Sequence, residues 1–196
     1  MDDARYYVAL MLVLFLPPAV GLWYLIHPFA AFWRRLGPVL TYLVLIGPVF
    51  LLGYATYQVR GVLVGTDFGT NPVTIALGVV AAVFGARVAF ARRKLLTQRI
   101  LVGVPELSTR DPGTLLTTGI YGRIRHPRYV EIVLFVLAYA LFANHLGGYA
   151  VAALSVPALY LVIVLEEREL RQRFGEAHAA YCRKVPMCIP RPRTRE

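Results

Sequence analysis

The chain has 196 residues, of which 58% are hydrophobic and only 16% are charged, and its mean hydropathy is +0.58. A soluble domain of this length cannot bury so much apolar surface, so the composition excludes an ordinary soluble protein and indicates an integral membrane protein. The formal net charge of +10 could suit a nucleic acid, but in a membrane protein basic residues more commonly contact anionic lipid head groups. We therefore expect membrane lipids, and no nucleic acid, as partners.

Five hydrophobic segments follow one another along the chain, each near the roughly 20 residues that cross a ~30 Å hydrocarbon core. They cover residues 6–26, 38–57, 72–90, 129–146 and 148–165. The first has no basic leader before it and no small-residue cleavage site after it, so we interpret it as a retained span. The expected fold is all-α: a polytopic membrane protein with about five transmembrane helices, the last two forming a C-terminal hairpin.

The first three segments, within residues 1–94, are expected to form a scaffold. Asn71 followed by Pro72 is typical of a helix start, because the amide side chain can cap the first turn and proline needs no N–H partner there. Small residues at helical spacing follow on the third segment, which allows another helix to approach closely; they are Gly78, Ala82, Gly85 and Ala89.

Basic residues are distributed unevenly between the segments, which predicts the orientation of the chain in the membrane. Arginines and lysines are frequent after the first, third and fifth segments, whereas residues 58–71 hold only Arg60 and residues 144–148 hold none. The positive-inside rule then puts the N-terminus outside and the C-terminus in the cytoplasm. We expect the cytoplasmic membrane of a bacterial or archaeal cell.

Residues 95–196 are expected to combine a polar cytoplasmic connector, the transmembrane hairpin and a basic tail. The connector is rich in turn-forming residues and can cover a site. Neither a glycine-rich nucleotide loop nor a nucleophile-elbow motif is present. His178, Cys182 and Cys188 lack the paired close spacing of a structural zinc site, so no metal is expected, and no disulfide is expected in the cytoplasm.

The fourth segment carries charged residues close to a short apolar run. Ile132 to Ala143 is only twelve residues, or about 18 Å of helix. Either the bilayer thins here, or the inner end of the helix, with His126 and Glu131, lies within the protein fold. Pro127 suits a first helical turn, and amide groups just before it would suit an anion. The alternative is an ordinary helix start whose arginines reach lipid phosphates.

Several motifs in the second half share their order and spacing with one known family. They are Thr117-Thr118-Gly119-Ile120-Tyr121, Arg125-His126-Pro127 with Tyr129, Glu166-Glu167 with Leu170 and Phe174-Gly175, Tyr181, Val185-Pro186 and Ile189-Pro190. Over roughly residues 105–190 the chain resembles the isoprenylcysteine carboxyl methyltransferase family and its phospholipid methyltransferase relatives, whereas the first three segments match only in being helical. The resemblance implies S-adenosylmethionine as cofactor, bound without a Rossmann domain, and a lipophilic or lipidated acceptor that arrives from the bilayer.

The resemblance also implies which residues contact the cofactor. They are Glu106, Gly113, Thr114, Leu115, Leu116, Tyr121, His126, Pro127, Arg128, Tyr129, Glu166 and Glu167. A cationic helix start suits the carboxylate of the cofactor, the glutamates suit its cationic and hydroxyl groups, and the tyrosines offer stacking or cation–π contact.

Two departures from the family pattern bear on the acceptor. Glu131 stands where the family has a small residue, and Val162 stands where prenylcysteine-specific members have an arginine. Glu131 is a candidate base for an amine, thiol or hydroxyl acceptor, and with Arg128 it forms the candidate catalytic pair. Without the arginine, anionic prenylcysteine analogues are expected to be poor substrates.

Two other functions stay open. The His-Pro-x-Tyr segment and the terminal Tyr181-Cys182 and Val185-Pro186 run also resemble membrane sterol reductases, which would bind NADPH. The Glu166-Glu167 pair and Phe174-Gly175 favour the methyltransferase. The third possibility is a non-catalytic membrane scaffold that retains the fold.

Overall fold

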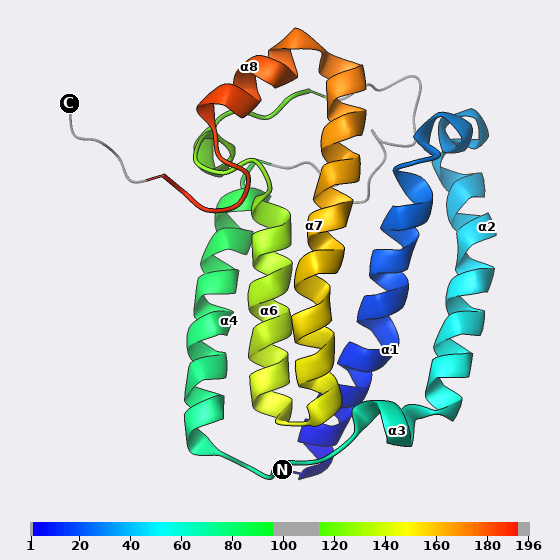
Figure 1. The fold of residues 1–196 in the computed structure, drawn as a ribbon, viewed down its shortest axis with the longest axis vertical. Coiled ribbons are helices and arrows are strands. Elements are labelled where there is room, and N and C mark those ends of the chain that lie inside the picture. Colours follow the sequence, from blue (N-terminus) through cyan, green and yellow to red (C-terminus); the bar gives the residue numbers. More distant parts are fainter. Residues whose placement is uncertain (1, 96–113, 192–196) are drawn as a thin grey trace.

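A computed structural model of the chain describes residues 2–95 and 114–191. Within these ranges the chain is helical, apart from turns, coil and one isolated bridge between Asp67 and His145. The long helices lie side by side as a bundle, with α8 at one end and α3 at the other, which we call the α8 end and the α3 end (Figure 1). The expected all-α architecture is confirmed.

The helices have the following bounds in chain order: α1 Asp2–Ile26, α2 Ala30–Gln58, α3 Arg60–Val64, α4 Pro72–Arg93, the 3-10 turn η1 Gly119–Gly122, α6 Pro127–Ala143, α7 Leu146–Phe174 and α8 Glu176–Lys184. Four of them, α1, α2, α4 and α7, are long and apolar enough to cross a membrane. With 17 residues, or about 25 Å, α6 falls short of a ~30 Å core, as its short apolar run predicts. At about 44 Å, α7 is longer than the core is thick, and its last turns extend beyond the bundle at the α8 end (Figure 1).

Two helix starts follow local sequence signals. The side chain of Asn71 accepts a hydrogen bond of 2.9 Å from the amide of Val73, and Pro72 occupies the first helical position, so the predicted start of α4 is confirmed. In α2 the backbone is interrupted at Gly37, where φ is +78°, and regular helix resumes at Pro38. The positive φ is accessible to glycine at little cost, and proline suits the helical position that follows.

The small residues of α4 face α6. A Cβ added at Gly78 would lie 3.0 Å from the carbonyl oxygen of Ala138, and one added at Gly85 would lie 3.4 Å from the Cβ of Leu134. The buried stripe continues at helical spacing through Ala89 to Arg92. The predicted close approach of the two helices is therefore confirmed. The same face of α4 places Arg92 beside Glu131 in the first turns of α6.

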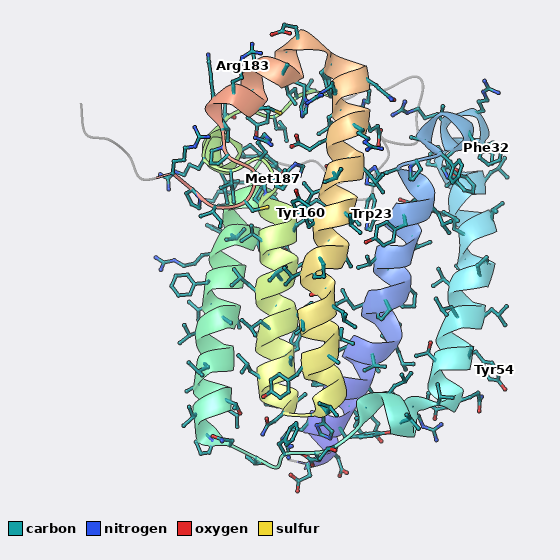
Figure 2. All side chains as sticks on the ribbon, in the orientation of Figure 1. Trp23, Phe32, Tyr54, Tyr160, Arg183 and Met187 are labelled. Carbon is teal, nitrogen blue, oxygen red and sulfur yellow. The ribbon has the colours of Figure 1, made fainter. Side chains whose placement is uncertain are left out.

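The outer surface of the bundle is apolar. Large side chains are exposed along α2 and α4, for example Phe50 at 71% and Val73 at 65%, and Tyr54 points away from the bundle (Figure 2). Such a surface suits contact with lipid tails and not with water. By contrast, α1 packs against both α6 and α7, and its Val20 joins Tyr129, Leu159 and Val162 in the core.

The α3 end is held together by a buried polar cluster. Arg5, 1% exposed, donates to Asp2 at 3.0 Å and also forms an ion pair with Asp67. Asn144 adopts a left-handed conformation with φ of +52°, and its side chain donates to the carbonyl oxygen of Gly69 at 2.8 Å and accepts from the hydroxyl of Tyr149 at 2.7 Å. These bonds join the start of α1, the α3–α4 loop and the α6–α7 turn.

Candidate functional site

The start of α6 is bound to the segment that follows α8. The backbone amide of Arg125 donates to the carbonyl oxygen of Pro186 at 2.9 Å, and that of His126 donates to Met187 at 3.0 Å. Figure 2 shows Met187 at the α8 end of the bundle. The expectation that the amides just before Pro127 are available to an anion is therefore wrong for these two groups, because the C-terminal segment already occupies them.

Two consecutive glutamates of α7 face the start of α6. The hydroxyl of Tyr129 donates to Oε2 of Glu166 at 2.7 Å, and Nε2 of His126 lies 2.7 Å from Oε1 of Glu167. The same imidazole brings its Nδ1 to 3.6 Å from Oε2 of Glu166. The guanidinium of Arg125 binds both oxygens of Glu167, at 2.8 and 3.2 Å. The two clusters that stand 37 to 42 residues apart in the sequence thus form one polar site.

The charge of His126 follows from this environment. Burial alone would lower the pKa of its imidazole, but the hydrogen bonds and negative charges of Glu166 and Glu167 outweigh burial and raise the pKa to about 9. His126 is therefore a cation at neutral pH. Together with Arg125 it places two positive charges against two carboxylates, so the site can bind both anionic and cationic groups of one ligand.

A cavity of about 110 Å³ opens beside these charges. Its walls come from the segment before η1, from η1, from the two residues that precede α6, from the last turns of α7 and from α8. The lining residues are Thr114, Leu115, Leu116, Tyr121, Arg125, His126, Glu166, Glu167, Leu170, Phe174, His178 and Tyr181. Typical ligand sites measure roughly 300 to 1,000 Å³. A large cofactor therefore needs these walls to move apart before it fits.

Most of the described candidate residues meet at this cavity. Seven of the predicted contacts line it. Tyr129 does not line it but donates a hydrogen bond to the lining residue Glu166, and Pro127 is buried at the first position of α6. Glu106 and Gly113 lie outside the described residues. Arg128 does not line the cavity: its guanidinium stacks 4.7 Å above the ring of Trp23 in α1.

Glu131 also lies elsewhere. It is 8% exposed and its carboxylate binds Arg92 of α4 through two hydrogen bonds of 2.7 and 3.1 Å. It borders a second, apolar cavity of about 500 Å³ between α1 and α6, lined also by Met11, Phe15 and Phe135. A role of Glu131 as a base stays a prediction.

Tyr121 lies near both cavities. Burial is the main cause that raises the pKa of its hydroxyl to about 12, and the charges that act on it include Arg92 and Glu131 as well as Glu166. Tyr121 is thus close to the ion pair at the apolar cavity and to the carboxylates of the polar one. Its carbonyl oxygen also accepts a hydrogen bond of 2.6 Å from the hydroxyl of Tyr181.

The contact residues inferred from the sequence omit one wall of the polar cavity. Leu170 and Phe174 follow Glu166 at intervals of four residues and so share its face of α7, a periodicity that the sequence already contains. His178 and Tyr181 reach the cavity only because the chain turns at Gly175, where φ is +53°. No sequence periodicity spans that turn.

The second half of the chain, with α4, matches a known protein family. A family model described as phospholipid methyltransferase matches residues 73–177. The match begins at the start of α4, so the expectation that the third span lies outside the resemblance is wrong. No solved structure matches the chain significantly.

Three curated proteins are similar over shorter segments. The chain is 38% identical over 86 residues to the cobalt-zinc-cadmium resistance protein CzcN of Cupriavidus metallidurans, covering 43% of this chain and 39% of that protein. It is 30% identical over 105 residues to the delta(14)-sterol reductase of Mus musculus, covering 50% and 24%. It is 36% identical over 80 residues to methanethiol S-methyltransferase 1 of Bradyrhizobium diazoefficiens, covering 40% and 27%. The matches span less than two fifths of the length of each relative.

The family model covers more than half of the chain, from α4 into α8, and includes both the start of α6 and the two glutamates of α7. The chain belongs to the phospholipid methyltransferase family.

Proposed function

We propose that the protein is an S-adenosylmethionine-dependent methyltransferase that modifies a lipophilic acceptor at the membrane. The observation that carries the proposal is the paired arrangement of two cations and two carboxylates around one cavity, within the region matched by the family model. The similarity to methanethiol S-methyltransferase 1 supports methyl transfer as the reaction.

The residues of the polar cavity fit the chemical groups of this cofactor. Its carboxylate suits the cationic His126 and Arg125, and its ammonium and ribose hydroxyl groups suit Glu166 and Glu167. The rings of Tyr121 and Tyr181 offer stacking to adenine or cation–π contact to a sulfonium. The bound cofactor would supply a methyl group that is readily transferred, so the main task of these side chains is to hold and align the reactants.

The apolar cavity between α1 and α6 suits the hydrophobic part of the acceptor. It is lined almost entirely by aliphatic and aromatic side chains, and its polar boundary is formed by Glu131. Because Arg92 compensates that carboxylate, a neutral polar group can approach without facing an unpaired charge. Val162 is fully buried in the core, so it leaves no space for an acceptor carboxylate at that position.

The proposed location is the cytoplasmic membrane, with the α8 end on the cytoplasmic side. Basic residues that flank the helices gather at the α8 end, among them Arg34, Arg93, Lys94 and Arg123. The positive-inside rule then gives the polar cavity access to cytosolic cofactor. Localisation to this membrane and the orientation are both part of the proposal.

Binding of the cofactor to the purified protein tests the proposal. In calorimetric titrations of the detergent-solubilised protein, Glu166→Gln and His126→Ala should each weaken binding of S-adenosylmethionine or its demethylated product by about 1.5–3 kcal/mol, or roughly 10- to 150-fold, because each removes a charge-assisted hydrogen bond. Glu176→Gln is the matched control, since that carboxylate is 80% exposed on α8 and pairs only with the exposed Arg183 in the described contacts. Unchanged affinity in both site variants would remove these residues from the cofactor site.

The similarity to a sterol reductase gives the second candidate, an NADPH-dependent reductase, which shares 30% identity over half of this chain. The same titration with NADPH separates the two functions. Binding of NADPH and not of S-adenosylmethionine would replace the methyltransferase by the reductase, and binding of neither would favour a non-catalytic scaffold.

A further inference from the structure

A cysteine, a histidine and a glutamate from two helices converge beside the polar cavity. Glu167 lies on α7, whereas His178 and Cys182 lie four residues apart on α8 and so share one face of that helix. The Sγ of Cys182 is 3.4 Å from Oε2 of Glu167 and 3.7 and 3.6 Å from the two ring nitrogens of His178. The three groups can place one ligand atom each within 4.8 Å of one another.

The two separations from the sulfur match edges of a tetrahedral metal site. Zinc binds thiolate sulfur at about 2.3 Å and nitrogen or oxygen at about 2.0 to 2.2 Å, so neighbouring ligand atoms lie roughly 3.3 to 3.6 Å apart. The observed distances between sulfur and its two neighbours are 3.4 and 3.6 Å. The ligand atoms of His178 and Glu167 lie within 4.8 Å of each other, so these two side chains must adjust to share an ion, and water can complete the coordination.

The three groups are largely shielded from water. His178 is fully buried, and the side chain of Glu167 is 15% exposed. Cys182 is partly buried, and binding of a metal ion requires its thiolate form and releases the thiol proton. Glu167 binds Arg125 through both oxygens and His126 through Oε1, and its Oε2 also faces Cys182.

The helix that carries two of the three groups is fixed in place. Arg125 donates to the carbonyl oxygen of Cys182 at 3.3 Å, and the amides of Arg125 and His126 bind the segment after α8. Because α8 is held against the start of α6, these hydrogen bonds help to keep Cys182 close to Glu167. A preorganised ligand set of this kind reduces the cost of binding.

We propose that Glu167, His178 and Cys182 form a binding site for a thiophilic divalent cation such as Zn²⁺ or Cd²⁺. The carboxylate and the thiolate supply two negative charges for the ion, and thiolate and imidazole are the ligands that these metals prefer. The thiol proton leaves to solvent when the S–metal bond forms. Glu167 also lines the polar cavity, so an ion bound here occupies a group that the proposed cofactor needs, and the two ligands compete.

Titration with Cd²⁺ tests this site without any catalytic assay. The full-length protein, free of a polyhistidine tag and in detergent, should develop the ultraviolet absorption band of a cadmium–thiolate bond with one ion per chain. Cys182→Ser should abolish the band, and His178→Ala should lower the affinity by more than the roughly 10- to 100-fold that loss of an outer hydrogen-bond partner of a ligand costs. Prior S-adenosylmethionine should raise the Cd²⁺ concentration needed for half-saturation.

Cys188→Ser is the matched control, because Cys188 is the other free cysteine of the chain and is not one of the three converging groups. It should retain the band and the affinity. Absence of the band from the unmodified protein, its persistence in Cys182→Ser, or its equal loss in Cys188→Ser would overturn the proposal. Because the band reports metal binding directly, it distinguishes failure of the metal site from failure of the proposed methyltransferase.

Discussion

The two ends of the bundle both bury charged side chains, but they use them differently. At the α3 end Arg5 binds the carboxylate of Asp2, and Asn144 donates to the carbonyl oxygen of Gly69. The neighbouring chain segments there are in close contact. At the α8 end the carboxylates of Glu166 and Glu167 bind His126 and Arg125 while still lining a cavity. Their side chains stay 27% and 15% exposed.

The difference shows that a costly polar group in a membrane protein is not by itself a sign of function. Intramembrane charges suggest a functional site by default. Arg5 is 1% exposed, against 4% for His126, yet its described bonds only join α1 to the α3–α4 loop. What separates the α8 end is the presence of both signs of charge at a cavity with aromatic walls.

Labelling of single cysteines tests on which side of the membrane each end of the bundle lies. It should give the largest effect, because a cysteine either reacts with an impermeant reagent in intact cells or does not. In a variant with Cys182→Ser and Cys188→Ser, Asp3→Cys should react with a membrane-impermeant maleimide in intact cells, and Arg183→Cys should react only after permeabilisation. Both positions are exposed, and they lie at opposite ends of the bundle (Figures 1 and 2). The reason is the excess of basic residues at the α8 end. The reverse pattern would invert the orientation and remove the cytosolic supply of cofactor.

The next largest effect is expected from the ion pair of Arg92 and Glu131, which lies at the α8 end but resembles the polar cluster of the α3 end in being buried. Their side chains are 8% and 11% exposed. Arg92→Leu should lower the free energy of unfolding by about 3–5 kcal/mol, because it leaves a buried carboxylate without its partner. The double variant with Glu131→Leu should lose less than the sum of the two single variants, as measured by unfolding in mixed detergent micelles.

A further variant, Glu131→Gln, separates a structural role of this carboxylate from a catalytic one. Full stability of Glu131→Gln together with lost methyl transfer would contradict a structural role and support Glu131 as the base. Lowered stability of the variant with unchanged cofactor affinity would show that the Arg92–Glu131 ion pair is structural, like the polar cluster of the α3 end.

A smaller effect distinguishes two adjacent glycines at the α3 end. A Cβ at Gly147 would lie 2.0 Å from the carbonyl oxygen of Leu63 and 2.9 Å from the Cα of Val64, whereas one at Gly148 would lie no closer than 3.5 Å to Ala140. Gly147→Ala should therefore lower stability by about 1–3 kcal/mol, because backbone atoms must move apart. Gly148→Ala should lie within about 0.5 kcal/mol of the unmodified protein. Thermal unfolding in detergent measures both, and equal midpoints would show that α3 is not packed against α7.

Much of the fold could be predicted because its signals are local. Asn71 and Pro72 mark a helix start by their own chemistry, and the small residues from Gly78 to Ala89 mark a packing face by their spacing. The meeting of His126 and Tyr129 with Glu166 could be inferred because these residues belong to motifs that resemble a family.

Other parts of the site depend on how helices are rotated against one another, which no local pattern encodes. Arg92 and Glu131 are 39 residues apart, and the partner of Glu131 could not be read from the sequence. The grouping of Glu167 with His178 and Cys182 crosses the turn at Gly175 and joins two helices, so a search for close ligand spacing on one segment misses it. The occupied amides before Pro127 were missed for the same reason, because their acceptors lie about 60 residues later.

The hydrogen bonds from Arg125 and His126 to Pro186 and Met187 also impose an order on biosynthesis. When the α6–α7 hairpin has just left the ribosome, Glu166, Glu167, His126 and Tyr129 are present. Pro186 and Met187, which bind the start of α6, still have to emerge. The pocket is therefore completed only when residues 186–187 have emerged, which follow Glu167 by 19 to 20 residues. Until then the amides of Arg125 and His126 lack their acceptors, and the charged side chains can pair only with one another, with lipid head groups or with water.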